Sequence, residues 1–131
     1  MLKVYSTADG STSVRYTVAG ELAGGEELFA PITDVASLRN APTVLRLDLV
    51  FFSFDKGMHA SLRWEDAESS LITPLEDRGF FSFESYFGGW SNPQREEFTG
   101  NICVKVLAGE EDRVWSFALK LELTKQSRKG N

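Results

Sequence analysis

The side chains best suited to chemistry are few in this sequence. His59 is the only histidine and Cys103 the only cysteine. A structural zinc site takes about four ligands, mostly cysteine and histidine, and these two residues cannot supply them. We therefore predict no metal site and no cofactor site. We expect His59 on the surface, and we expect Cys103 to be a small buried side chain rather than a reactive thiol.

Three groups of carboxylates remain as candidates for acid–base chemistry. They are Glu65, Asp66 and Glu68; Glu96 and Glu97; and Glu110, Glu111 and Asp112. Two carboxylates across a cleft can hydrolyse a glycosidic bond, and calcium takes about 6–8 oxygen ligands. Each group falls in a predicted loop or at a strand end, and none follows a calcium-loop pattern. The sequence therefore predicts no catalytic residues and no enzyme activity.

The aromatic segment Phe80–Trp90 is the strongest candidate for binding, because it holds six aromatic residues. Adjacent strand residues point to opposite faces, so Phe80 and Phe81 cannot both lie on one buried face. Exposed aromatic rings can anchor a protein interface or stack on sugars. The same rings also suit packing within the fold, so both roles stay open for this segment. The predicted interface residues are Lys3, Val4, Tyr5, Phe80, Phe81, Tyr86, Phe87 and Trp90.

Strands must position these groups, because apolar residues alternate with polar ones along most of the chain. In Val114–Leu123, five apolar side chains share one face; they are Trp115, Phe117, Leu119, Leu121 and Leu123. Similar alternation predicts strands at 14–18, 45–54, 59–65 and 102–106, with shorter ones at 71–73 and 80–84. Turn residues separate them. This pattern predicts an all-β, antiparallel β-sandwich or jelly-roll-like fold of about seven or eight strands.

Two further predictions each concern a single segment of the chain. Within Thr43–Phe54, the alternation predicts one face made of Leu45, Leu47, Leu49 and Phe51. The other face changes midway from polar to apolar residues; they are Arg46 and Asp48, then Val50, Phe52 and Phe54. This change predicts that the second face becomes covered by a loop or another chain. Only Asp34–Leu38 suggests a helix, as a single turn with Asp34 as its N-cap.

The length of 131 residues suits one domain spanning residues 1–131. Residues 1–12 are a candidate N-terminal arm, and residues 125–131 are predicted to be a flexible polar tail. The net charge of −5 opposes nucleic-acid binding, which depends on lysine and arginine. The chain has no recognisable signal peptide and no run approaching the ~20 apolar residues of a membrane helix. We expect a protein that is assembled in the cytoplasm and does not bind membranes.

Short motifs along the chain resemble those of a family. They are a WEDA element at 64–67, an FGG loop followed by Asn at 87–92, a TGNI strand at 99–102 and a closing strand that ends in Lys. In this order, over roughly residues 5–125, the chain resembles small virion proteins of tailed bacteriophages. The family pattern has Trp-Asp-Ala and Thr-Gly-Asp-Ile, so this chain has one extra residue in the first motif and Asn101 in the second.

The resemblance implies a structural virion protein, plausible as a capsid decoration or cement protein on the head shell. Its expected partners are the major capsid protein and copies of itself, as a homo-oligomer made in the host cytoplasm. Two alternatives stay open. One is a head–tail connector, tail or adsorption component, and the other is a carbohydrate-binding β-sandwich.

Overall fold

The computed structural model describes the whole chain except residues 1, 41, 43, 68, 84–98 and 127–131. Strands dominate the described part, with one 3-10 turn, η1 (Val35–Ser37). The strands are β1 (Leu2–Asp9), β2 (Ser13–Leu22), β3 (Glu27–Pro31), β4 (Val44–Phe54), β5 (His59–Trp64), β6 (Leu71–Leu75), β7 (Arg78–Ser82), β8 (Ile102–Leu107) and β9 (Trp115–Gln126). The described residues include no helix long and apolar enough to cross a membrane.

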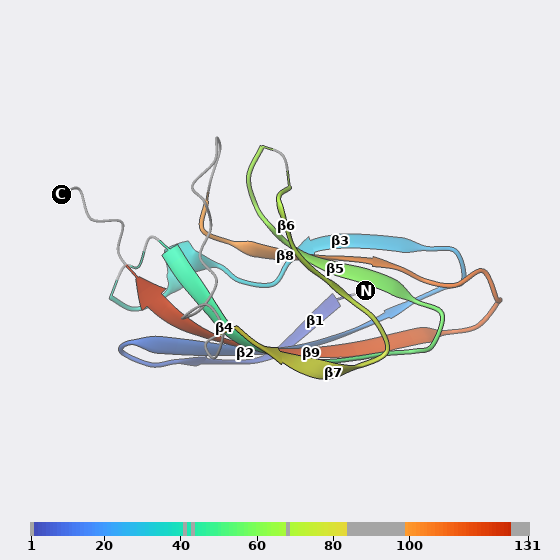
Figure 1. The fold of residues 1–131 in the computed structure, drawn as a ribbon, viewed down its shortest axis with the longest axis horizontal. Helices are drawn as coiled ribbons and strands as arrows, with labels where there is room; N and C mark the ends of the chain where they lie inside the picture. The colour runs from blue at the N-terminus through green and yellow to red at the C-terminus, as the bar shows by residue number, and fades with distance from the viewer. Residues whose placement is uncertain (1, 41, 43, 68, 84–98, 127–131) are drawn as a thin grey trace.

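Two antiparallel sheets face each other as the layers of a sandwich (Figure 1). Sheet A has the strand order β1-β2-β9-β4-β7, and sheet B has the order β3-β8-β5-β6. The prediction of an all-β antiparallel sandwich is therefore confirmed.

The inward-facing side chains of β9 form one wall of the core. Its five predicted inward side chains, from Trp115 to Leu123, are all buried, and the residues between them face outward. β2 contributes Val14, Tyr16 and Val18 beside them, while β5 and β8 supply the opposite wall, including Leu62 and Val104. Each large apolar side chain buried in this way contributes about 1.5–3 kcal/mol to folding. The core thus lies between the sheets, as two half-buried layers require.

One face of β4 differs from the prediction. Leu45 and Leu47 are fully buried, but a β-bulge between Leu47 and Leu49 then shifts the register. An inserted residue exchanges the two faces of a strand with period two. The inward residues beyond the bulge are accordingly Val50, Phe52 and Phe54, whereas Leu49 is half-buried and Phe51 is exposed. The predicted face of Leu45, Leu47, Leu49 and Phe51 is therefore wrong in its second half.

The candidate arm contains a strand. Residues 2–9 form β1, which pairs antiparallel with β2 and is the edge of sheet A. Pairing to the β2 backbone orders this segment despite its weak apolar pattern, so residues 2–9 are not a free arm.

The predicted helical turn is present at Val35–Ser37, but its cap differs. The Asp34 side chain makes no capping hydrogen bond. Instead, the Val35 N–H donates to Asn101 Oδ1 at 2.8 Å. A side chain 66 residues away in sequence therefore satisfies the free donor at the start of the turn.

Candidate interaction surface

The residues suited to chemistry are placed apart from one another. His59 is exposed at the start of β5, as predicted. Of the carboxylates, Glu65 and Asp66 follow β5, and Glu110–Asp112 lie between β8 and β9, whereas Glu68, Glu96 and Glu97 lie outside the described residues. Within the described ranges, no three His, Cys, Asp or Glu side chains gather as metal ligands.

Cys103 is buried in β8 with 1% of its surface exposed. Burial raises the pKa of its thiol to about 12, and the negative charge of Glu65, whose Oε2 lies 3.9 Å from Sγ, acts in the same direction. A thiol must ionise to act as a nucleophile. Cys103 therefore remains protonated near neutral pH, in agreement with its predicted role as a buried filler.

Glu65 belongs to a hydrogen-bond network that joins two motifs distant in sequence. Thr99 Oγ1 donates to Glu65 Oε1 at 2.6 Å, and the Glu65 N–H donates to the Asn101 carbonyl at 2.9 Å. Asn101 Oδ1 also accepts from Thr33 Oγ1 at 3.3 Å. These contacts fasten the 64–67 and 99–102 motifs to η1. Two of the four motifs that carry the resemblance are thus next to each other and have a structural role.

A polar cluster, defined as Arg46, Asp48 and Thr124, lies at one end of the outer face of sheet A. Arg46 Nε donates to Asp48 Oδ1 at 2.7 Å, and Thr124 Oγ1 donates to Asp48 Oδ2 at 2.5 Å. Arg46 Nη2 also donates to Thr124 Oγ1 at 3.1 Å. Asp48 is the residue inserted at the β4 bulge, so the cluster satisfies the carboxylate that the bulge would otherwise leave unpaired.

A groove of about 450 Å³ borders this cluster, and three carboxylates line it: Asp9, Asp48 and Glu122. Each carboxylate has a cation nearby. Lys125 Nζ donates to Asp9, Arg46 pairs with Asp48, and Arg15 Nε lies 3.9 Å from Glu122 Oε1. The Lys125 Nζ also donates to the carbonyls of Gly10 and Arg39. Because its charges are paired internally, the groove does not present the unbalanced charge that a small ion would require.

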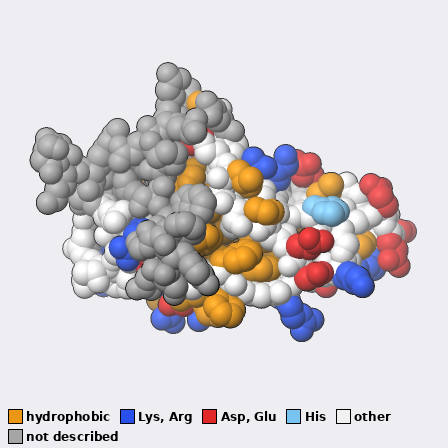
Figure 2. All heavy atoms as spheres, viewed as in Figure 1, with side chains coloured by type: hydrophobic (Ala, Val, Ile, Leu, Met, Phe, Trp, Pro, Cys, Tyr) orange, Lys and Arg blue, Asp and Glu red, His pale blue; other side chains and the backbone are white. Residues whose placement is uncertain are grey.

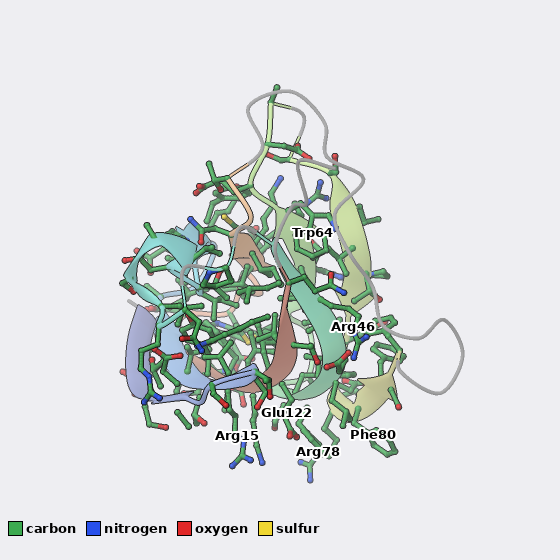
Figure 3. All side chains as sticks on the ribbon, turned by 90° about the vertical axis from the view of Figure 1, so that its left-hand side faces the viewer. Arg15, Arg46, Trp64, Arg78, Phe80 and Glu122 are labelled. Atoms are coloured by element: carbon green, nitrogen blue, oxygen red, sulfur yellow. The ribbon has the colours of Figure 1, made fainter. Side chains whose placement is uncertain are left out.

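The aromatic surface, defined as Phe51 and Phe80 with the flanking cations Lys120 and Arg78, lies on the same outer face beyond the bulge. Phe51 of β4 is directly opposite Phe80 of β7 on one side and Lys120 of β9 on the other. The two rings stack with centroids 5.7 Å apart, and Lys120 Nζ lies 5.3 Å from the centre of the Phe51 ring. Figure 3 shows Phe80 and Arg78 pointing away from the second sheet. This surface is apolar and has the cations Lys120 and Arg78 beside its two rings.

The exposure of Phe51 and Phe80 distinguishes this pair of rings from the buried aromatic residues of the core. Phe80 is 61% exposed and Phe51 is 38% exposed. Figure 2 shows hydrophobic side chains gathered near the middle of the molecule, whereas acidic side chains gather toward the end where His59 lies. Two neighbouring exposed phenylalanines differ from the singly scattered apolar residues normal for a protein surface.

The predicted interface residues divide into three sets. Phe80 and Phe81 lie on β7 and are exposed, with Phe81 on the opposite side of the strand against Phe52. Lys3, Val4 and Tyr5 lie within β1, on the far edge of sheet A from β7. Tyr86, Phe87 and Trp90 lie outside the described residues. The structure therefore places Phe80 and Phe81 on the same edge strand but on opposite faces of sheet A, and it separates both from the β1 residues.

Sequence reasoning missed Phe51 and Lys120. The alternation placed Phe51 on the same face as Leu45 and Leu47, and the bulge instead turns its ring outward beside Phe80. The available signal was the change after Asp48, where the apolar residues Val50 and Phe52 take the face that Arg46 and Asp48 occupy before it.

The chain matches no protein-family model, no curated protein sequence and no solved structure. The arrangement of the aromatic surface is therefore the main structural basis for assigning a function.

Proposed function

We propose that this domain is a non-enzymatic structural protein that binds another protein through the aromatic surface. The observation that carries the proposal is the stacked, exposed pair Phe51 and Phe80 on the outer face of sheet A. Fully burying an exposed phenylalanine contributes about 1.5–3 kcal/mol, and covering these partly exposed rings contributes a part of that. Aromatic residues are typical anchors of protein interfaces.

The charges around the rings favour an acidic partner surface. Lys120 and Arg78 flank the pair on β9 and β7, although the whole chain carries a net charge of −5. Local positive charge on an acidic protein steers association with a complementary negative patch and disfavours wrong partners. The partner is thus expected to present apolar residues bordered by carboxylates.

The resemblance to virion proteins of tailed phages makes the major capsid protein our proposed partner. The domain would then decorate and stabilise the head shell, after assembly in the host cytoplasm. If the copies are joined in the expected homo-oligomer, binding at one lattice site raises the effective concentration at the next, so the oligomer binds more tightly than one copy does.

The test is to mix the purified protein with expanded capsids that lack it and to measure saturable co-sedimentation. Phe80→Ser is expected to weaken binding about tenfold or more, because it removes the most exposed ring. The matched control is Phe29→Ser, which removes a ring that is 48% exposed on sheet B. The absence of saturable binding, or equal losses in both variants, would contradict the proposal.

The same experiment separates the alternatives. A head–tail connector or tail component would saturate at few copies per particle, whereas a decoration protein would saturate at many. Stacked rings can also hold a sugar face, so a carbohydrate-binding role predicts that a glycan array is bound by wild type and lost in Phe80→Ser. Glycan binding without capsid binding would replace the capsid proposal.

A further inference from the structure

The turn between β1 and β2 contains a dipeptide that is prone to spontaneous modification. Asp9 and Gly10 form the only Asp-Gly pair in the sequence, and the sequence contains no Asn-Gly pair. Glycine has no Cβ, so its backbone nitrogen can approach the preceding side chain closely. In an Asp-Gly pair this nitrogen can attack the carboxyl group, and the main chain is then rebuilt through the side chain as isoaspartate.

The modification proceeds in two steps and needs only water. The Gly10 nitrogen gives up its proton and bonds to Cγ of Asp9, while one carboxyl oxygen leaves as water, which closes a succinimide ring. A water molecule then adds to one of the two ring carbonyls. Addition at Cγ restores aspartate, and addition at the backbone carbonyl gives isoaspartate of unchanged mass. The first step is fastest with a protonated carboxyl, because a hydroxyl leaves more readily than an oxide, and with a nitrogen that is free to turn toward Cγ.

Donors hold both oxygens of the Asp9 carboxylate. Lys125 Nζ donates to Oδ1, and the Arg39 N–H donates to Oδ2 at 2.9 Å. The Lys125 side chain is only 4% exposed and also donates to the carbonyls of Gly10 at 2.6 Å and Arg39 at 3.0 Å. The Lys125 hydrogen bond, followed by that of the Arg39 N–H, lowers the pKa of Asp9 from its ordinary value of 3.8. The carboxyl therefore stays in the ionised form, which reacts slowly.

The turn that carries the attacking nitrogen is held as well. The Gly10 N–H donates to the Ser13 carbonyl at 2.9 Å, and the Lys125 N–H donates to the Thr12 carbonyl at 2.9 Å. Attack would require the Gly10 nitrogen to break its bond to Ser13 and to rotate toward Cγ of Asp9. The backbone bonds to β9 oppose that rotation.

The same turn accounts for the presence of glycine at position 10. A Cβ there would lie 3.1 Å from the Ser13 carbonyl oxygen, which accepts the Gly10 N–H across the turn. A larger residue would crowd the turn, and the carboxylate of Asp9 is the partner of the buried Lys125. The reactive pair thus follows from how the turn is built.

From these contacts we infer that the Asp9-Gly10 pair is a site of succinimide and isoaspartate formation and that Lys125 protects it in the folded protein. Asp9 and Val14 are the last pair of the β1–β2 ladder. Isoaspartate would lengthen the main chain at this pair and move the carboxylate away from Lys125, so the damage would loosen the edge of sheet A. The inference does not depend on the partner that the proposed function names.

The test follows the full chain in water labelled with the heavy oxygen isotope, in a mildly acidic buffer. Each turnover of the ring leaves one heavy oxygen in the tryptic peptide 4–15, and chromatography separates its isoaspartate form. Folded wild type is expected to react at least about tenfold more slowly than the same chain in urea. Lys125→Met should raise the folded rate about tenfold or more, since it removes a charge-assisted hydrogen bond that opposes the reaction.

Two further variants separate protection from general loosening. Val104→Ala removes part of a fully buried side chain in β8 and leaves the contacts of the turn in place, so it should keep the wild-type rate. Lys125→Gln keeps an N–H donor without the charge and should give an intermediate rate, which also tests the inference if the methionine variant does not fold. Wild-type rates in both Lys125 variants would overturn the inference, and so would an equal rise in Val104→Ala.

Discussion

The two ends of the outer face of sheet A use the same strand, β4, in opposite ways. Before the bulge, the polar cluster places Asp48 between Arg46 and Thr124, with distances of 2.5–3.1 Å among the three side chains. After the bulge, Phe51 stacks on Phe80 of the edge strand, and both rings remain exposed to solvent. The polar groups before the bulge are hydrogen-bonded within the protein, whereas the rings after the bulge expose apolar surface to solvent.

This difference indicates where binding energy is available. A charge already paired within the protein gains little from a partner, since new contacts must replace existing ones. An exposed ring gains from leaving water in proportion to the area that is still exposed, which is larger for Phe80 than for Phe51. We therefore expect the polar cluster to support folding and the aromatic surface to support association, and substitutions at each end test that division.

The largest expected effect separates the two faces of β4 beyond the bulge. Phe52 is 8% exposed and packs on Phe54 and Phe81, so Phe52→Ala should lower the free energy of unfolding by about 3–5 kcal/mol. Phe51→Ala should cost about 1 kcal/mol, because only a half-exposed ring is lost. Urea unfolding followed by tryptophan fluorescence measures both. Similar losses would mean that the bulge does not turn Phe51 outward.

A smaller loss is expected from the polar cluster. Asp48→Ala removes the acceptor for Arg46 and Thr124 and should lower the free energy of unfolding by about 1–3 kcal/mol. Glu122→Ala is the matched control, because its cation Arg15 lies 3.9 Å away and is half-exposed; it should change stability by less than about 0.5 kcal/mol. If the two substitutions have the same effect in urea unfolding, the cluster does not stabilise the bulge.

A pH-dependent part of stability is expected from Lys125. Its hydrogen bond holds the pKa of Asp9 below the ordinary value of 3.8, and the Arg39 N–H bonded to the same carboxylate acts in the same direction. A lowered folded-state pKa contributes stability that is present above the unfolded pKa and is lost as the pH falls through the folded value.

Lys125→Met removes that partner while keeping an apolar stem. The difference in stability between wild type and the variant should therefore be largest near neutral pH and should shrink as the pH falls below about 4. Urea unfolding at several pH values measures it. Lys56→Met, in the exposed turn after β4, serves as the control and should give a difference that does not depend on pH. A constant difference for Lys125→Met would contradict the assigned coupling.

Periodicity was sufficient to predict the sandwich, because strands such as β9 bury every second residue. It could not predict the bulge at Asp48, since the cluster that stabilises it includes Thr124, 76 residues away in sequence. The exposure of Phe80 followed partly from its position next to Phe81, but its partner Phe51 depended on that same bulge. β1 was missed as a strand because its order comes from pairing with β2 rather than from its own apolar pattern.

The smallest effect on stability is expected at Lys120, which makes the comparison of the two ends most direct. Lys120 and Lys125 are both on β9, but the first lies over an exposed ring and the second is hydrogen-bonded to Asp9. A cation over an exposed aromatic ring contributes about 0.5–1 kcal/mol. Lys120→Met should therefore change the free energy of unfolding by no more than about 0.5–1 kcal/mol. Under the proposed function it should also weaken capsid binding and make that binding less sensitive to salt. A loss of stability at Lys120 equal to that at Lys125, with unchanged binding, would show that both ends serve folding alone.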